Sequence, residues 1–268
     1  MNETLGVVIG YDGTDHSMQA LDWAMDEAEF RKLPLTVCHA WQWPYGDADQ
    51  TGRDSLRRAA EHVLWHGADC ARTSSPGLDV RPDLYEGSAT GRLEELSAEA
   101  ELVVVGSRGL GAVARAIVGS VAAHTVAHAR CPVIVVRGKG SLPRSPHPGP
   151  IVAGLADDDK VDAVLGFAFT EAAMRHLPLL VVHAWQPSLD PPAVQNATEN
   201  WLARALMPWR EKDPTVRIET HTPRSRVGEA LASIADATLV VVGSSHGWFG
   251  SVTAAMLGHA PCPVAIVR

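Results

Sequence analysis

The sequence predicts an α/β protein with two tandem, doubly wound domains, each with a five-stranded parallel sheet flanked by helices. Three observations lead to this fold class: an internal duplication, apolar runs without polar alternation, and helical segments between those runs. Strands buried on both faces read as near-continuous Val, Ile and Leu, and a parallel sheet covered by helices buries its strands in this way.

The duplication is visible as three pairs of matching segments in the same order. LPLTVCHAWQ matches LPLLVVHAWQ at an offset of 144 residues, LVVVGS recurs at an offset of 137, and CPVIVVR matches CPVAIVR at an offset of 131. A falling offset indicates a duplication followed by deletions in the second copy.

The segment between the copies, GKGSLPRSPHPGP, is rich in Pro, Gly and Ser and has no apolar period. Such a composition is typical of a linker. We therefore expect one domain over residues 1–138, a linker over 139–149 and a second domain over 150–268.

Strand and helix alternate along the first copy. The run GVVIG ends in turn residues and predicts a strand, and the next segment places Ala20, Leu21, Ala24 and Ala28 on one helical face. The same criteria predict strands over 6–10, 35–41, 79–85, 102–106 and 132–136, and helices over 17–29, 55–71, 92–100 and 120–129.

Composition and charge exclude several classes of protein. The chain has 268 residues, 46% of them hydrophobic, and a formal net charge of -8, which argues against a surface that neutralises nucleic-acid phosphates or anionic lipid. It has no long apolar run, and its start, MNETLGVVIGYDG, lacks the features of a signal peptide. We expect a cytoplasmic protein.

The four cysteines, Cys38, Cys70, Cys131 and Cys262, are scattered without C-x-x-C spacing. This pattern indicates neither a zinc site nor a disulfide framework, so buried free thiols are expected. His124 and His128 lie four apart on an expected helix, but no zinc-hydrolase motif surrounds them, and we expect no metal site.

Ligands of doubly wound sheets bind beyond the carboxyl ends of the strands, where the winding direction reverses. This rule places the YDG turn and the GSRG turn together at the carboxyl ends of the strands, an edge of the sheet that we call the mouth. Gly106, Gly109 and Gly119 follow the spacing G-x2-G-x9-G. Glycines let backbone amides approach a phosphate, and a helix start adds unsatisfied N–H donors, although glycines also simply make turns. Ser120 would cap that helix or donate its hydroxyl to a phosphate.

Asp12 follows the first strand. Its carboxylate could meet a ribose hydroxyl, an adenine amine or a magnesium ion, and the alternative is an ordinary Asp-Gly turn residue. His39 and His183 occupy equivalent strand ends, where packed or hydrogen-bonded histidines are expected. Trp41, Trp43 and Trp185 lie near the mouth, where core or interface positions are the alternative to stacking on a ligand.

The combination of VVIGYDG, GSRG-x9-GSV and CPVIVV resembles the universal stress protein family, and the likeness extends over both copies. The resemblance implies an adenine nucleotide alpha hydrolase-like fold, ATP bound with or without Mg2+, no strong catalytic activity, and a role in stress responses. By position, it also implies that the ATP contacts fall on Asp12, Ala40, Val105, Gly106, Arg108, Gly109, Gly119, Ser120, Val121 and Ala122.

The second copy departs from this pattern. Asp12 corresponds to Ala156, with the nearest carboxylate displaced to Asp157, and the glycine loop loses six residues. Gly250 survives at the helix start, and Trp248 and Phe249 would fill the space that a triphosphate needs. We therefore expect the first domain alone to hold nucleotide, and the second to be a structural or regulatory partner.

Three function classes remain: a nucleotide-binding stress or signalling protein, a weak ATPase, and a scaffold that binds no nucleotide. No G-x4-G-K-[ST] loop, nucleophile elbow or paired base is visible, so an enzyme is the less favoured class. The expected partners are an adenine nucleotide and an unidentified protein, with no nucleic acid and no membrane. The last strands, Val133–Val136 and Val264–Val267, predict an intramolecular pseudo-dimer, and a homodimer is compatible with it.

Overall fold

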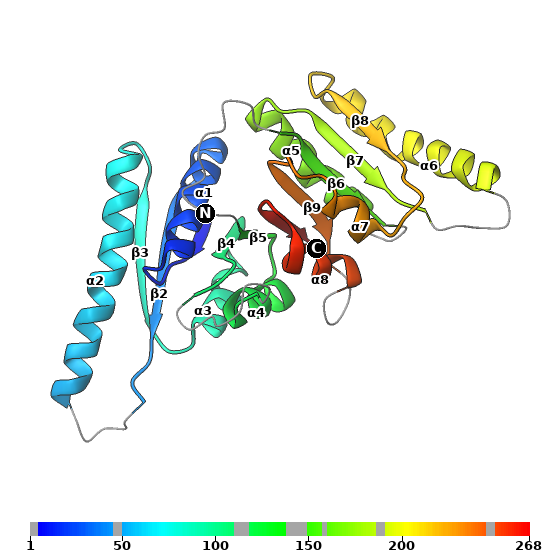
Figure 1. Cartoon of the computed structure of the whole chain (residues 1–268). Coiled ribbons are helices and arrows are strands. Elements are labelled where there is room, and N and C mark those ends of the chain that lie inside the picture. The colour runs from blue at the N-terminus through cyan, green and yellow to red at the C-terminus, as the bar shows by residue number, and fades with distance from the viewer. Residues whose placement is uncertain are drawn as a thin grey trace. The chain divides into compact units, whose positions relative to one another are not determined.

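Strand and helix alternate in both halves of the chain in a computed structural model (Figure 1), which describes residues 5–44, 50–109, 118–137, 149–156, 160–185, 191–244 and 250–268. The chain divides into two units, Met1–Pro143 and Arg144–Arg268. The expected linker, residues 139–149, lies almost wholly outside the described residues. The exact domain bounds and the pairing of the two halves stay predictions.

The first unit is a five-stranded parallel sheet in the order β3-β2-β1-β4-β5. Helices α1 and α2 pack on one face of this sheet, and α3 and α4 pack on the other. Its elements are β1 Val7–Gly10, α1 Asp15–Arg31, β2 Leu35–Trp41, α2 Gln50–Ser74, β3 Val80–Glu86, α3 Ala89–Leu96, β4 Leu102–Gly106, α4 Ser120–His128 and β5 Val133–Val136.

The second unit repeats the arrangement with the order β8-β7-β6-β9-β10. Helices α5 and α6 cover one face, and α7 and α8 cover the other. Its elements are β6 Ile151–Leu155, α5 Val161–Arg175, β7 Leu179–His183, α6 Pro191–Lys212, β8 Ile218–His221, α7 Val227–Ala232, β9 Leu239–Gly243, α8 Ser251–His259 and β10 Val264–Val267. The predicted fold class is confirmed in both units.

The strand registers support the alignment of the two copies. Gly10 pairs with Cys38 and Val105 in the first unit, and Gly154 pairs with Val182 and Val242 in the second. These pairs differ by the same 144 and 137 residues that separate the matching sequence segments. The duplication therefore extends to the position of each strand relative to its neighbours.

The duplication also includes a buried ion pair on the first helix of each unit. Glu27 is fully buried and accepts a hydrogen bond of 3.1 Å from Arg31 Nε, and Glu171 accepts one of 3.0 Å from Arg175 Nε. A buried carboxylate requires such a partner, because an uncompensated charge inside a protein is strongly destabilising. The two units thus share this ion pair as well as the positions of their strands.

One predicted element is misplaced. The apolar pattern predicted a helix over 92–100, whereas α3 spans Ala89–Leu96. Ser97 ends the helix: its hydroxyl donates to the Glu94 carbonyl at 2.6 Å and accepts from the Arg130 amide at 2.9 Å. Serine side chains compete for backbone groups in this way, which periodicity does not reveal.

The core of each unit consists of its central strands, whose Val, Ile and Leu side chains are almost completely buried. β3 differs because it is an edge strand, with mostly half-exposed residues and Pro82 within it. Proline is tolerated there because an edge strand need not use every N–H in the ladder. No helix in the described part of the chain is long and apolar enough to span a membrane.

Candidate functional site

The two turns expected to form one mouth do meet in the first unit. β1 lies between β2 and β4, so the direction of winding reverses between β1 and β4. The turns after these strands lie so close that a Cβ placed on Gly109 would be 2.5 Å from Asp12 Oδ2. A larger residue at position 109 would therefore force the Asp12 carboxylate to move.

Asp12 has a structural role in its turn. Its Oδ1 accepts hydrogen bonds from the Thr14 amide at 3.1 Å and from the Thr14 hydroxyl at 2.6 Å. Thr14 in turn caps α1 by accepting from the Ser17 amide at 3.3 Å. One carboxylate oxygen therefore stabilises the turn, which is the role of an ordinary Asp-Gly turn residue. The other oxygen lies against Gly109.

The two ends of the glycine loop are in contact, although residues 110–117 between them are outside the described residues. The Gly119 amide donates to the Ser107 carbonyl at 2.8 Å. A Cβ on Gly119 would lie 3.4 Å from Arg108 Cα, which is ordinary van der Waals contact. Among the described residues, the packing therefore leaves room for a Cβ at position 119.

Gly119 is the N-cap of α4, with φ −62° and ψ 152°, and no side chain caps the helix. Ser120 is the first helical residue, so the prediction that Ser120 caps this helix is wrong. The first helical hydrogen bond runs from Ala123 to the Gly119 carbonyl at 3.0 Å. The amides of Ser120, Val121 and Ala122 therefore precede the helical ladder, in the arrangement that suits an anion.

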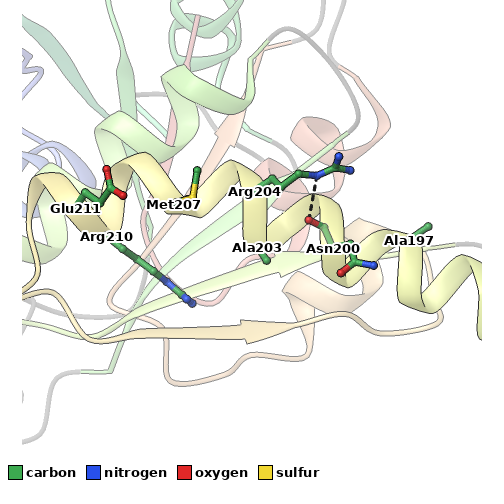
Figure 2. Close-up of a pocket in the computed structure, with 7 residues that line it drawn as sticks. All are labelled: Ala197, Asn200, Ala203, Arg204, Met207, Arg210 and Glu211. Carbon is green, nitrogen blue, oxygen red and sulfur yellow. Dashed lines mark hydrogen bonds between the residues drawn. The ribbon is translucent and has the colours of Figure 1, made fainter.

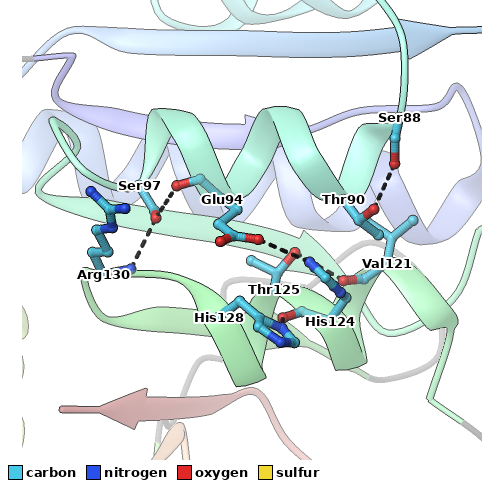
Figure 3. A network of polar contacts seen from close by, with 9 residues as sticks. All are labelled: Ser88, Thr90, Glu94, Ser97, Val121, His124, Thr125, His128 and Arg130. Carbon is cyan, nitrogen blue, oxygen red and sulfur yellow. Dashed lines mark hydrogen bonds and ion pairs between the residues drawn. The ribbon is translucent and has the colours of Figure 1, made fainter.

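Helix α4 is tied to α3 by a polar network (Figure 3). His124 Nε2 lies 3.1 Å from Glu94 Oε2, and His128 Nδ1 donates to the His124 carbonyl at 3.0 Å, with the two rings stacked 4.0 Å apart. Together with the contact between Ser97 and Arg130, these contacts hold the middle and the end of α4 beside α3. Within the described ranges, no three His, Cys, Asp or Glu side chains come together to hold a metal ion.

The other predicted contacts lie at the same edge of the sheet. Ala40 is half-buried near the end of β2 and pairs with Tyr85, and Val105 is a buried strand residue. Arg108 is half-buried beside Gly119. A Cβ on Gly106 would lie 2.8 Å from the His16 carbonyl oxygen, so this glycine serves the packing of α1 on β4.

Tyr11 is a residue of the site that the sequence did not single out. Its carbonyl accepts from His39 Nδ1 at 2.8 Å, and its hydroxyl lies 2.8 Å from His66 Nδ1. Burial, with smaller effects from Cys70 and Asp12, raises the pKa of Tyr11 to about 12. In the sequence, the HAW segment that both copies share is the signal for this contact. Its histidine makes the same bond in the second unit, where His183 Nδ1 donates to the Leu155 carbonyl at 3.1 Å.

His39 and His183 are both buried and hydrogen-bonded, as the sequence predicted. Trp41 and Trp185 are also buried, and the indole N–H of Trp185 donates to the Thr222 carbonyl at 3.2 Å. Trp43 is half-buried. For Trp41 and Trp185, burial therefore favours a position in the core over stacking on a ligand.

The second unit keeps the architecture of the mouth. Gly250 caps α8 with φ −56° and ψ 154°, as Gly119 caps α4. A Cβ on Gly243 would lie 2.9 Å from Lys160 Cβ, so it serves helix packing as Gly106 does. The predictions for the displaced carboxylate of Asp157 and for the rings of Trp248 and Phe249 concern residues outside the described ranges.

A cavity of about 150 Å³ lies at this edge of the second unit, lined mainly by glycine and aliphatic side chains. Pockets for drug-sized ligands are typically about 300–1,000 Å³. Ala156 lines the cavity at the position that corresponds to Asp12, and Thr253 donates to the Gly243 carbonyl at 3.3 Å. Among the described residues that line the cavity, none supplies a carboxylate at the position of Asp12.

A larger hollow of about 680 Å³ lies on the second unit (Figure 2). All of its lining side chains come from α6, and none comes from a strand end. Arg204 Nε donates there to the Asn200 carbonyl at 3.3 Å, within the helix itself. The residues are Ala197, Asn200, Ala203, Arg204, Met207, Arg210 and Glu211. This surface is unrelated to the mouth of the sheet.

Comparison with known proteins agrees with the repeat. The model of the universal stress protein family matches residues 6–137 and again 149–268. Universal stress proteins Rv2005c and Rv2623 of Mycobacterium tuberculosis are 34% and 30% identical to the chain. The alignments cover 98% and 100% of this chain and 97% of each relative.

Solved structures show the same fold. A universal stress protein from Archaeoglobus fulgidus has a TM-score of 0.76 at 15% identity, with 99% of both chains covered. The double family match and the curated relatives over the whole length agree with the duplicated strand order described above. The chain therefore belongs to the universal stress protein family, as a tandem member.

Proposed function

We propose that the first unit binds ATP, with or without Mg2+, at the edge between β1 and β4, and that the protein has a regulatory role in a stress response. The observation that carries this proposal is the contact between Asp12 and Gly109 beside Gly119, where a Cβ would meet no described atom closer than 3.4 Å. A carboxylate, a glycine-lined approach and three helix-start amides lie together there. This set suits a nucleotide, with amides toward phosphate and the carboxylate toward a ribose hydroxyl, an amine or a metal ion.

The difference between the two copies supports a ligand role for this set. Gly106 and Gly119 have structural counterparts in Gly243 and Gly250, so these two glycines do not distinguish the units. Asp12 and Gly109 correspond to Ala156 and His246, so the carboxylate and the glycine that faces it are replaced together. Both changes fall at the place where a nucleotide would bind.

The alternatives are a weak ATPase and a scaffold without nucleotide. The segment GSRGLGAVARAIVGS contains no lysine to offset charge on a leaving phosphate. Phosphoryl transfer depends on such positioned charges and on a group that orients the attacking water. These features favour binding without rapid hydrolysis.

Titration calorimetry of the full chain with ATP tests the proposal. Gly119→Val should abolish binding, because the new side chain would enter the space expected for phosphate, while the protein packing around position 119 accepts a Cβ. Asp12→Ala should weaken binding about tenfold or more, equivalent to a loss of about 1.4 kcal/mol.

Gly250→Val is the matched control, because Gly250 caps the corresponding helix of the second unit. We expect nearly unchanged ATP affinity in this variant. Loss of binding in Gly250→Val with retention in Gly119→Val would assign the site to the wrong unit. Absence of saturable binding in the unaltered chain would favour the scaffold.

A further inference from the structure

A cluster on the first unit, apart from the mouth, contains a cysteine and a histidine within reach of each other. Cys70 Sγ lies 3.9 Å from His66 Nε2, one turn apart on α2. Both line a hollow of about 460 Å³ on the helix. Cys38, Cys131 and Cys262 are buried, whereas Cys70 is only partly covered. This is the one thiol of the four that is accessible beside an imidazole.

The histidine is held in an orientation that directs Nε2 toward the thiol. Its other ring nitrogen, Nδ1, lies 2.8 Å from the Tyr11 hydroxyl. Tyr11 is itself fixed, because its carbonyl accepts from His39 and its ring packs on Gly67, where a Cβ would come within 2.7 Å. A hydrogen bond from the second ring nitrogen is what orients histidines that bind metals.

We propose that Cys70 and His66 form a two-donor site for a soft metal ion, Cu(I), with Tyr11 as the residue that positions His66. Thiolate and imidazole are donors that suit copper. With the bond lengths known for zinc, about 2.3 Å to sulfur and about 2.0 Å to nitrogen, as a guide, two donors to one ion lie up to about 4.3 Å apart. The observed separation of 3.9 Å therefore permits one ion to touch both atoms.

The number of donors selects the ion. No third His, Cys, Asp or Glu converges with this pair in the described part of the molecule. Structural zinc sites are almost always four-coordinate and are closed by protein ligands. Cu(I) accepts two donors, so the pair is sufficient for copper. Binding replaces the Cys70 thiol proton with the metal, and the proton is released to solvent.

The test is an anaerobic competition of the reduced full chain against a chromophoric Cu(I) chelator. We expect one Cu(I) per chain, a loss of affinity of about 100-fold in Cys70→Ser and His66→Gln, and a loss of about tenfold in Tyr11→Phe, as for other residues that orient a ligand. X-ray absorption of the loaded chain should show one sulfur and one nitrogen donor. Circular dichroism verifies that each variant is folded.

His62→Gln is the matched control, because His62 lies one turn earlier on α2 and also lines the hollow. Its affinity should stay within twofold of the unaltered chain. Undiminished binding in Cys70→Ser, an equal loss in His62→Gln, or two sulfur donors at copper would each overturn the assignment. None of these outcomes depends on ATP binding, so the proposed function is tested separately.

Discussion

Asp83 and Arg92 show how one residue pair connects an edge strand to a helix. Asp83 on β3 accepts from Arg92 Nη2 at 2.7 Å and from Arg92 Nε at 3.0 Å, and both side chains are about one-fifth exposed. Burial by itself would raise the pKa of Asp83. The hydrogen bonds from Arg92 and Cys38, together with the Arg92 charge, outweigh burial and lower this pKa.

This pair predicts a loss of stability in acid. Because folding lowers the pKa of Asp83, its contribution is fully present above the unfolded carboxyl value of about 4 and disappears as the pH falls through the lower folded value. Asp83→Asn should reduce the free energy of unfolding by about 2 kcal/mol at pH 7. Urea unfolding at pH 7 and pH 3 should show a smaller difference between the two proteins at pH 3.

Asp79→Asn provides the control, because Asp79 pairs with Arg81 at the surface, where its side chain is 61% exposed. Exposed pairs contribute about 0–1 kcal/mol, so this variant should unfold nearly like the unaltered chain. An equal acid dependence in both variants would show that the Asp83 pair has no special role.

At the scale of elements, the two glycines at the ends of the loop have different structural roles. Gly106 allows the start of α1 to approach the end of β4, since a Cβ there would lie 2.8 Å from a backbone oxygen. Gly119 begins α4, and a Cβ there would meet no described atom closer than 3.4 Å. Helix packing requires the first glycine, whereas the fold tolerates a side chain at the second.

Gly106→Ala should therefore lower the free energy of unfolding by about 1–3 kcal/mol, the usual cost of forcing an atom into a packed site. Gly119→Ala should cost about 1 kcal/mol or less, the loss expected at a helix cap. Urea unfolding of the full chain measures both.

Gly77→Ala is a suitable reference, because a Cβ at Gly77 would have nothing within 4 Å. Its stability should be unchanged within about 0.5 kcal/mol, as for other surface substitutions. If Gly119→Ala proved as damaging as Gly106→Ala, the space at position 119 would be required by the protein and not by a ligand.

At the scale of the whole molecule, duplication has produced two units with one architecture and different residues after the first strand, Asp12 in one unit and Ala156 in the other. Helix starts, strand order and buried ion pairs are repeated, because each sheet must still be covered and each buried charge still paired. Asp12 is not repeated, because Ala156 stands at the corresponding position of the second unit. Loss of a ligand contact costs the fold little, so it can change in one copy while the core is retained.

We therefore expect one ATP per chain and no rapid turnover. Calorimetry should saturate at a ratio of one, and phosphate release under multiple-turnover conditions should stay well below about 1 per second, the low end for working enzymes. Release at that rate which disappeared in Gly119→Val would show an ATPase at this site. A ratio of two would show that the second unit also binds nucleotide.

The sequence by itself determined the strands, the duplication, the family and the edge of the sheet where the two turns of the candidate site meet. These features depend on local patterns, such as the apolar run of β4 and the glycine spacing, or on the repetition of such patterns. Even there, a serine hydroxyl that bonds to the backbone displaced the end of α3 from its predicted position.

Only the tertiary structure decided which residues meet. The contact of Asp12 with Gly109, the hydrogen bond between Tyr11 and His66, and the pairing of Asp83 with Arg92 join different elements of the fold. Their geometry depends on the order of strands in the sheet and on the packing of helices against it. Neither is set by any short segment, so residues such as Tyr11 acquire their role only when the sheet is assembled.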